Sequence, residues 1–193
     1  TLFRSPSIHP AILRLVAHAA SGQRPTSGAA RGPEERHVGL VTNGRRLAYR
    51  PFSQAILRAG LGSASVKIFA ADAPTADAIA RDTGAHDQSI AALAELARVD
   101  LPREIRLPLH RLSLATLPLA ADLAARTRAH GLRLEAALDA IGLDHLREAH
   151  EAIDRLEARC FTLGVPLTAS RLESGTRAFD ALPSPSPRDS RRR

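Results

Sequence analysis

The chain is poor in several residue types, and each shortage excludes a class of protein. Among its 193 residues there is one cysteine, Cys160, no tryptophan and no methionine, and aromatic residues make up only 3%. A single cysteine excludes an internal disulfide framework and a cysteine-based metal cluster. It also favours a reducing, cytoplasmic location. No apolar run approaches the ~20 residues of a membrane span, and no signal peptide is recognisable. Because methionine is absent, we expect a processed or partial product.

The residues that are present favour helices and a basic surface. Hydrophobic residues make up 44% of the chain, and with so few aromatics the core has to be built from Ala, Leu, Ile and Val. The formal net charge is +7 and the isoelectric point is near 11.1; nearly all cations are arginines, since Lys67 is the only lysine. Arginine binds phosphates and guanine edges. A GC-rich genome gives the same composition, so the charge permits nucleic-acid binding without proving it.

Hydrophobic periodicity predicts a mainly α fold in three parts. Residues 1–72 combine a helix at 11–20, strands at 37–42 and 64–70, and a helix at 53–60, which together make a small α/β or mixed N-terminal part. From Thr75 to about Leu163 the apolar spacing is helical, so residues 73–165 are expected to form a helical part with a helix–turn–helix. Residues 166–193 are expected to be a loop followed by a disordered basic tail.

A long apolar stripe is the clearest feature of the second half. Residues 132–161 predict one amphipathic helix, or two helices broken near Gly142. Such a stripe forms part of a core or binds a partner helix, and we expect a homo-oligomer through it. Cys160 lies on the stripe and is therefore expected to be buried and inert. The stripe comprises Leu138, Ile141, Gly142, Leu146, Ala149, Ile153, Leu156 and Cys160.

The segment TADAIARDTGAHDQSIAALAEL, residues 75–96, has the spacing of a helix–turn–helix. Thr75 is the expected N-cap, Ala80 the site of close helix crossing, and Gly84 the turn residue with positive φ. The start of the second helix would then face the major groove of DNA. It contains no arginine, and ordinary helix packing is the alternative. The predicted DNA contacts are His86, Gln88, Ser89 and Ala92, with Arg191, Arg192 and Arg193 of the tail on phosphates.

The order of several motifs resembles the DNA-binding core of the ParB/KorB partition-protein family. After the helix–turn–helix comes a Leu-Pro-x-Glu-Ile step and a Leu-Ser helix start within residues 96–125. Upstream, HVGLVTNGRRLAYR (37–50) and AGLGSASVKIF (59–69) resemble the family's nucleotide box and the segment that follows it. The glutamate of that box is absent here, and so is the family's Glu-Asn-x-x-Arg segment.

The resemblance implies DNA binding of a clamp-like kind at a centromere-type site. It also implies that Gly44, Arg45 and Arg46 would lie near the phosphates of CTP, the one cofactor that the resemblance implies; the residues by themselves indicate none.

Signals for catalysis are weak. The eight histidines are scattered along the chain, and no paired base and nucleophile is recognisable, so we expect neither catalytic residues nor a metal site. The function expected from sequence is that of a sequence-specific DNA-binding protein of partition or regulatory type. Two alternatives stay open: a helical capsid or nucleoprotein subunit with an arginine tail, and a helical interaction or effector protein.

Overall fold

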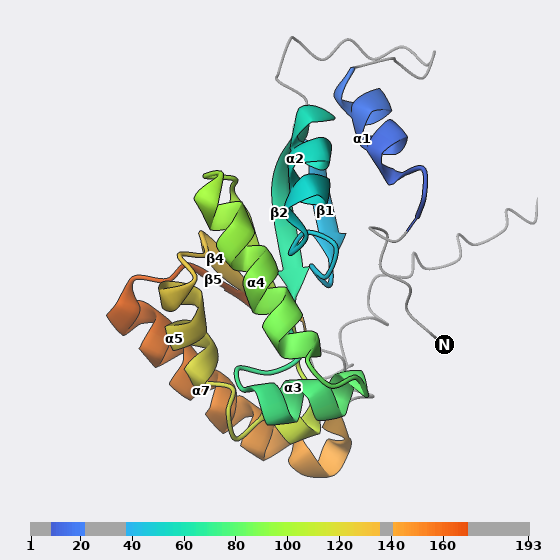
Figure 1. Cartoon of the computed structure of the whole chain (residues 1–193). Helices are drawn as coiled ribbons and strands as arrows, with labels where there is room; N and C mark the ends of the chain where they lie inside the picture. The colour runs from blue at the N-terminus through green and yellow to red at the C-terminus, as the bar shows by residue number, and fades with distance from the viewer. Residues whose placement is uncertain (1–8, 22–37, 136–140, 170–193) are drawn as a thin grey trace, which may run out of the picture.

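The computed structural model describes residues 9–21, 38–135 and 141–169, in which helices and strands alternate along the chain (Figure 1). The strands are β1 (Val38–Thr42), β2 (Leu61–Lys67), β3 (Arg103–Pro108), β4 (Gly131–Glu135) and β5 (Leu167–Ala169). The helices are α1 (Ile12–Ala20), α2 (Arg50–Arg58), α3 (Ala73–Ala80), α4 (Ala85–Arg98), α5 (Leu119–Arg126) and α7 (Leu146–Leu163). Two short 3₁₀ helices, η2 (Arg111–Ser113) and η3 (Leu143–His145), precede α5 and α7.

All the strands in the described residues belong to one sheet of five, and every neighbouring pair is parallel. The spatial order β1-β2-β3-β4-β5 is the same as the order along the chain, and β1 and β5 are the two edges. One register row crosses the whole sheet from Thr42 through Val66, Ile105 and Leu132 to Leu167. The sequential order means that each strand is joined to its neighbour by a βα crossover.

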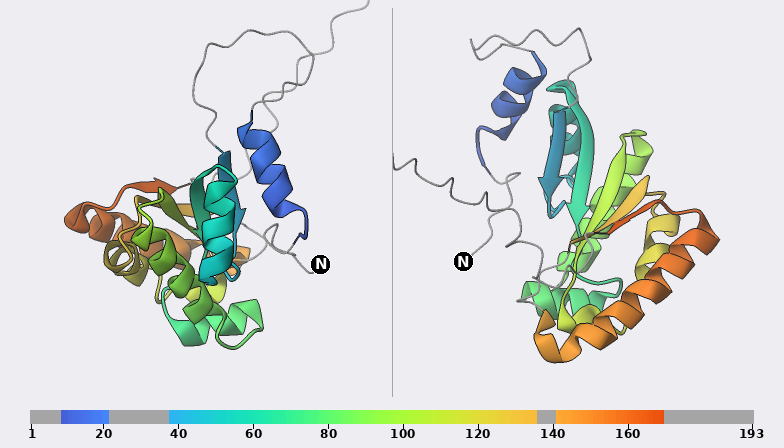
Figure 2. Two further views of the ribbon diagram at one scale, coloured as in Figure 1. Left: turned by 45° about the horizontal axis from the view of Figure 1, so that its top comes forward. Right: turned by 180° about the vertical axis from the view of Figure 1, so that it is seen from behind.

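This strand order places the connecting helices on one side of the sheet. Right-handed crossovers are the rule for parallel strands, and when each new strand is added at the same edge they bring every helix to the same face. In (β/α) barrels the same rule produces an outer ring of helices. Helices α2, α4 and α5 contact the strands, and α7 packs against α5. Seen from behind, the strands lie in front and no described helix crosses them (Figure 2).

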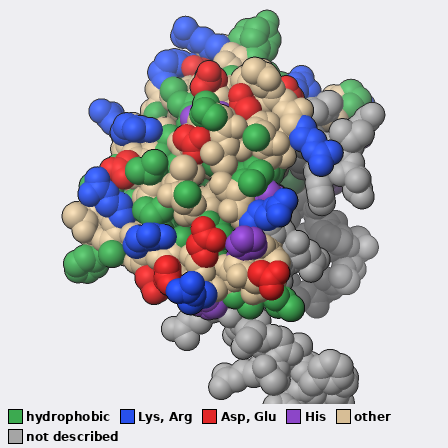
Figure 3. Space-filling view, turned by 90° about the horizontal axis from the view of Figure 1, so that it is seen from below, with side chains coloured by type: hydrophobic (Ala, Val, Ile, Leu, Met, Phe, Trp, Pro, Cys, Tyr) green, Lys and Arg blue, Asp and Glu red, His purple; other side chains and the backbone are tan. Residues whose placement is uncertain are grey.

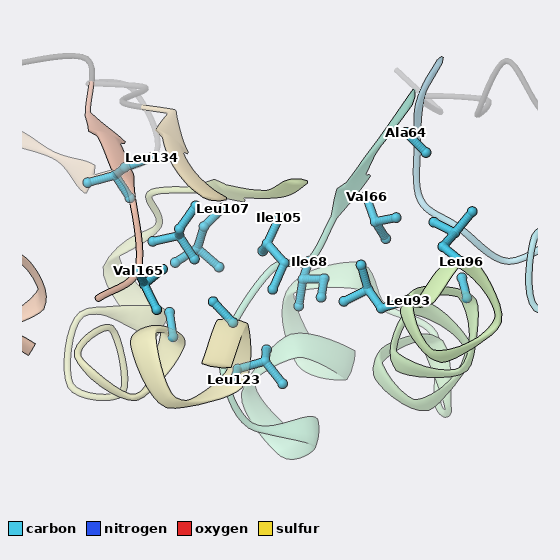
Figure 4. Close-up of a cluster of buried hydrophobic side chains, with 14 of the residues drawn as sticks. Ala64, Val66, Ile68, Leu93, Leu96, Ile105, Leu107, Leu123, Leu134 and Val165 are labelled. Carbon is cyan, nitrogen blue, oxygen red and sulfur yellow. The ribbon is translucent and has the colours of Figure 1, made fainter. Parts of the chain in front are cut away.

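The core lies between the sheet and these helices. Ile105 and Leu107 on β3 point toward the helices, where Leu93 and Leu96 of α4 and Leu123 of α5 approach the strands (Figure 4). Ile105, Leu107, Leu93 and Leu96 are completely buried. Burying aliphatic side chains of this size contributes about 1.5–3 kcal/mol each, so a core without tryptophan is held by many leucines and isoleucines.

The prediction of a mainly α fold is wrong, because a continuous parallel sheet alternates with the helices. β3 (Arg103–Pro108) lies within residues 73–165, the part that was expected to be helical. β2 belongs to the first predicted part and β3 to the second, and the two strands pair directly. The sheet and its core therefore run across the boundary that was expected near residue 72. The third part, 166–193, contributes β5 and otherwise lies outside the described residues.

The prediction of helix over 132–161, as one helix or as two broken near Gly142, is also wrong in its first part. Residues 131–135 form β4, and the helix α7 begins only at Leu146. Within α7 the expected burial is found for Ala149, Leu156 and Cys160, whereas Leu146 and Ile153 are half-buried and Leu138 lies outside the described residues. Because α7 packs against α5, the buried part of this stripe is covered within the chain, and association of two copies through the stripe stays a prediction.

The two helices predicted over residues 75–96 are present as α3 and α4, with Gly84 at φ +81° before α4. The N-cap of α3 is Asp72 and not Thr75: the backbone N–H of Thr75 donates to Asp72 Oδ1 at 2.9 Å. An aspartate three residues earlier caps the helix because its carboxylate reaches the free N–H groups of the first turn. Although burial opposes it, hydrogen bonds from Thr75 and Thr116 hold the pKa of the Asp72 carboxyl below its usual value.

Candidate functional site

The face of the sheet away from the helices is charged. Along β3 the buried Ile105 and Leu107 alternate with Glu104 and Arg106, and along β4 the buried Leu132 and Leu134 alternate with charged residues in the same way. Successive side chains of a strand point to opposite faces. The charged positions therefore gather on the open face. We call this group the sheet-face charge network: Lys67 of β2, Glu104 and Arg106 of β3, and Arg133 and Glu135 of β4.

Short ion pairs connect the network across three strands. Glu135 accepts from Arg106 Nη1 at 2.8 Å and lies 3.5 Å from Lys67 Nζ. Glu104 accepts from Arg133 Nε at 2.7 Å. The register places Lys67, Arg106 and Arg133 side by side in one row across β2, β3 and β4. Three adjacent cations are thus held by two carboxylates.

Arg106 is the centre of the network, and its bonding is incomplete. Its Nε atom is buried and has no hydrogen-bond partner; the nearest carboxylate oxygen, Glu104 Oε1, is 3.9 Å away. A buried donor without a partner costs about 1–3 kcal/mol, and three cations on two carboxylates leave one positive charge in surplus. Both features favour an additional anionic group beside Arg106.

A hollow of about 280 Å³ adjoins the network on the same face, toward the amino ends of the strands. Ser63, Ser65 and Thr168 line it together with Glu104. In parallel β/α folds, ligands bind at the carboxyl ends of the strands. The hollow is at the opposite end, so we assign the candidate site to Lys67, Arg106 and Glu135, which lie nearer the carboxyl edge.

His110 follows β3 at that carboxyl edge. Its Nδ1 accepts from the backbone N–H of Leu112 at 3.2 Å, so the neutral ring carries its proton on Nε2. Burial, with a smaller contribution from the cation of Arg111, lowers the pKa of His110 below its ordinary value. Burial thus favours the neutral imidazole over the cation.

The structure separates the residues predicted to contact DNA. Ser89 and Ala92 are buried, and Ser89 Oγ donates to the backbone carbonyl of Asn43 at 2.9 Å. These two face the sheet and cannot meet a base edge, because α4 packs that side on β2 and β3. Gln88 is exposed, and His86 is largely covered. Arg191, Arg192 and Arg193 lie outside the described residues.

The residues predicted to bind CTP lie in the turn after β1, at the carboxyl edge. Gly44 has φ +81°, and its N–H donates to Thr42 Oγ1. Arg45 Nη1 pairs with Asp82 at 2.5 Å, and the guanidinium of Arg46 lies 4.1 Å from the ring centre of Phe52. Both arginines thus have partners within the chain.

Charges of both signs are mixed on the surface at this end of the molecule. The view from below, where α3 lies, shows Lys and Arg side chains interspersed with Asp and Glu (Figure 3). Among the residues that the structure describes, no group of three His, Cys, Asp or Glu side chains is arranged to hold a metal ion. Within the same ranges, none of the helices combines the length and apolar character needed to cross a membrane.

Sequence reasoning missed every member of the sheet-face charge network. The signal was the alternation of charged and apolar residues in REIRLP and GLRLE, which is typical of a strand with one polar face. A scan against protein-family models and a search of the curated proteins found no match to this chain.

Proposed function

We propose that this chain binds a small molecule carrying a carboxylate or phosphate group on the open face of its sheet. The anionic group lies against Arg106 and Lys67, with Glu135 on its other side. The observation that carries the proposal is the surplus of positive charge in the sheet-face charge network, together with the buried Nε of Arg106 that lacks a hydrogen-bond partner.

The fold supports this location. Parallel β/α sheets collect ligand-binding side chains from neighbouring strands at their carboxyl ends, because the connecting loops meet there. Lys67 is the last residue of β2 and Glu135 the last residue of β4. Arginine offers a planar fork of donors that matches a carboxylate or a phosphate, and a lysine beside it adds a point charge.

The test is calorimetric titration of the full chain with succinate and, separately, with inorganic phosphate at low salt. We expect one of the two anions to bind with a Kd below about 1 mM, and the preferred anion identifies the chemical class. Arg106→Gln should weaken binding about tenfold or more, which corresponds to about 1.4 kcal/mol. Circular dichroism of the variant checks that the fold is kept.

Arg159→Gln is the matched control, because it removes the same charge from an ion pair elsewhere. Arg159 pairs with Asp122 at 2.6 Å between α7 and α5. Neither residue belongs to the sheet-face charge network. The control should bind the anion as the parent does. Equal loss in both variants would mean that only overall charge matters, and binding of neither anion to the parent would contradict the proposal.

We retain sequence-specific DNA binding as a second proposal. It is supported by the two consecutive helices α3 and α4 joined through Gly84, by the exposed Gln88 on α4, and by the net charge of +7. Gln88 has the side chain that reads adenine. Because Ser89 and Ala92 are buried, Gln88 is the residue of α4 proposed to contact the bases.

Selection of bound sequences from a random DNA pool at about 150 mM salt tests it, since non-specific phosphate contacts weaken steeply with salt. Gln88→Ala should cost about 1–3 kcal/mol on the selected site and relax the choice at one base pair. Gln54→Ala on α2 serves as the control and should leave the preference intact. A preference that survives Gln88→Ala unchanged would exclude reading by α4.

A further inference from the structure

A groove of about 530 Å³ lies between α4 and α5, on the helical layer and away from the sheet-face charge network. Its floor is apolar, made by Ile90, Ala94 and Ala97 of α4 and by Leu123 of α5. Ala94 is exposed and Ile90 only half-buried, so nothing in the described chain covers this strip. The groove follows α4 from its first turn to its last residue, a length suited to an elongated occupant.

Cations line one end of the groove. Arg98 is the last residue of α4, Arg126 the last residue of α5, and Arg128 follows two positions later. Arg98 is held by Glu95 through two hydrogen bonds of 2.9 and 2.6 Å. That interaction, aided by Ser53, lowers the pKa of Glu95 to about 2. Arg126 and Arg128 are exposed, and within the described residues their guanidinium groups form neither a hydrogen bond nor an ion pair.

Arg128 occupies a backbone position that favours glycine. Its φ is +53° just after the end of α5, where the left-handed conformation is common and glycine adopts it without a steric penalty. The backbone bonds that close the helix, Arg128 N–H to Ala125 O and Ala129 N–H to Ala124 O, need no side chain. An arginine here is less stable locally than a glycine would be, so stability within the chain does not explain its presence.

We infer that the groove docks a short amphipathic helical segment of a partner protein that is acidic at one end. Apolar side chains of the segment, spaced three and four residues apart, fill the strip over Ile90, Ala94 and Leu123. Its carboxylates meet Arg126 and Arg128. Charge complementarity fixes the direction, because Asp87 lines the opposite end of the groove.

The arginines have an alternative explanation, since cations near the ends of helices interact favourably with the helix dipole. An interaction with the helix dipole needs no partner molecule. It predicts that removing the two charges changes only the stability of the fold. The docking role instead predicts that Arg126 and Arg128 act on an acidic ligand and that a bulky side chain at Ala94 blocks it. The two explanations therefore differ in a measurable property other than stability.

The experiment is a selection of helical peptides from a random library against the full chain, with peptides of the length of α4, 14 residues. We expect enriched peptides with glutamates or aspartates at one end and leucines at helical spacing. In fluorescence anisotropy, an enriched peptide should bind Arg126→Gln/Arg128→Gln about tenfold more weakly, and its all-amide counterpart should bind the parent equally weakly. Ala94→Gln should abolish binding. Arg128→Gly should weaken binding while leaving the melting temperature unchanged or higher.

The matched control is Arg147→Gln/Arg155→Gln on α7, which removes the same charge from exposed positions. It should bind the peptide as the parent does. Loss of binding in this control equal to that in Arg126→Gln/Arg128→Gln would show attraction by net charge and overturn the inference. So would enriched peptides that bind Ala94→Gln normally, or a selection that yields no peptide dependent on the groove.

Discussion

Leu156→Ala is expected to lower the free energy of unfolding by about 3 kcal/mol, within the 2–5 kcal/mol found for buried leucines. Leu156 is completely buried on α7, the helix that packs against α5. Truncation removes the transfer energy of the side chain and leaves a cavity that close-packed neighbours fill only partly. Urea unfolding followed by circular dichroism at 222 nm measures the change, and the melting temperature should fall by roughly 6–12 °C.

Phe161→Ala, five residues further along the same helix, is the control. Phe161 is 90% exposed, so its removal should change the free energy of unfolding by less than about 0.5 kcal/mol. The pair tests the position of α7 directly. Similar losses in both variants would mean that α7 presents a different face to the core.

Gly44→Ala is expected to destabilise the chain by about 3 kcal/mol. Gly44 has φ +81°, which costs a residue with a Cβ about 1–2 kcal/mol. A Cβ here would also lie 2.9 Å from Ala92 Cβ and 2.9 Å from Val66 Cγ1. Overpacking of this kind adds about 1–3 kcal/mol, because β2 and α4 have to separate. Denaturant unfolding of the variant checks the sum.

Gly84→Ala separates the two contributions. Gly84 has the same φ of +81°, but nothing lies within 4 Å of a Cβ built there. Its substitution should therefore cost only the backbone term, about 1–2 kcal/mol. Equal losses at the two glycines would show that the turn after β1 is not packed between Ala92 and Val66.

Local sequence patterns predicted the elements whose signal lies within a few neighbouring residues. The apolar spacing of residues 11–20 predicted α1, the alternation in HVGLVT predicted β1, and Gly84 marked the turn before α4. Each of these signals depends on a few neighbouring residues, so no tertiary information was needed.

The α/β fold class was not predicted, because strands such as β3 and β4 are short and carry charged residues. In β4 only Leu132 and Leu134 face the core. Two apolar residues are too few to distinguish the alternation of a strand from the apolar spacing of the helix that follows. The pairing of β4 with β3 decides the structure, and it joins residues almost thirty positions apart, such as Ile105 and Leu132. Tertiary pairing therefore overrode the local helical pattern.

The candidate site was hidden for the same reason. Lys67, Arg106 and Glu135 are unremarkable in the sequence, since each is one charge among apolar residues. They meet only because parallel strands in register bring their side chains to one face. Conversely, Ser89 was chosen from its place in a motif, and the amphipathic packing of α4 turns it inward.

The sequential order of the strands has a consequence for how the chain reaches this structure. Every strand pairs with the strand that comes next along the chain, so the sheet can grow from β1 to β5 one βα unit at a time. Each addition closes a loop of limited length, and the loss of chain entropy is distributed over successive steps instead of being required at once. This order confines each pairing to consecutive units, although every parallel pairing is itself non-local and therefore slow to form. It also allows the earlier strands to assemble while later ones are still being synthesised, as in repeat proteins in which each unit contacts only its neighbours.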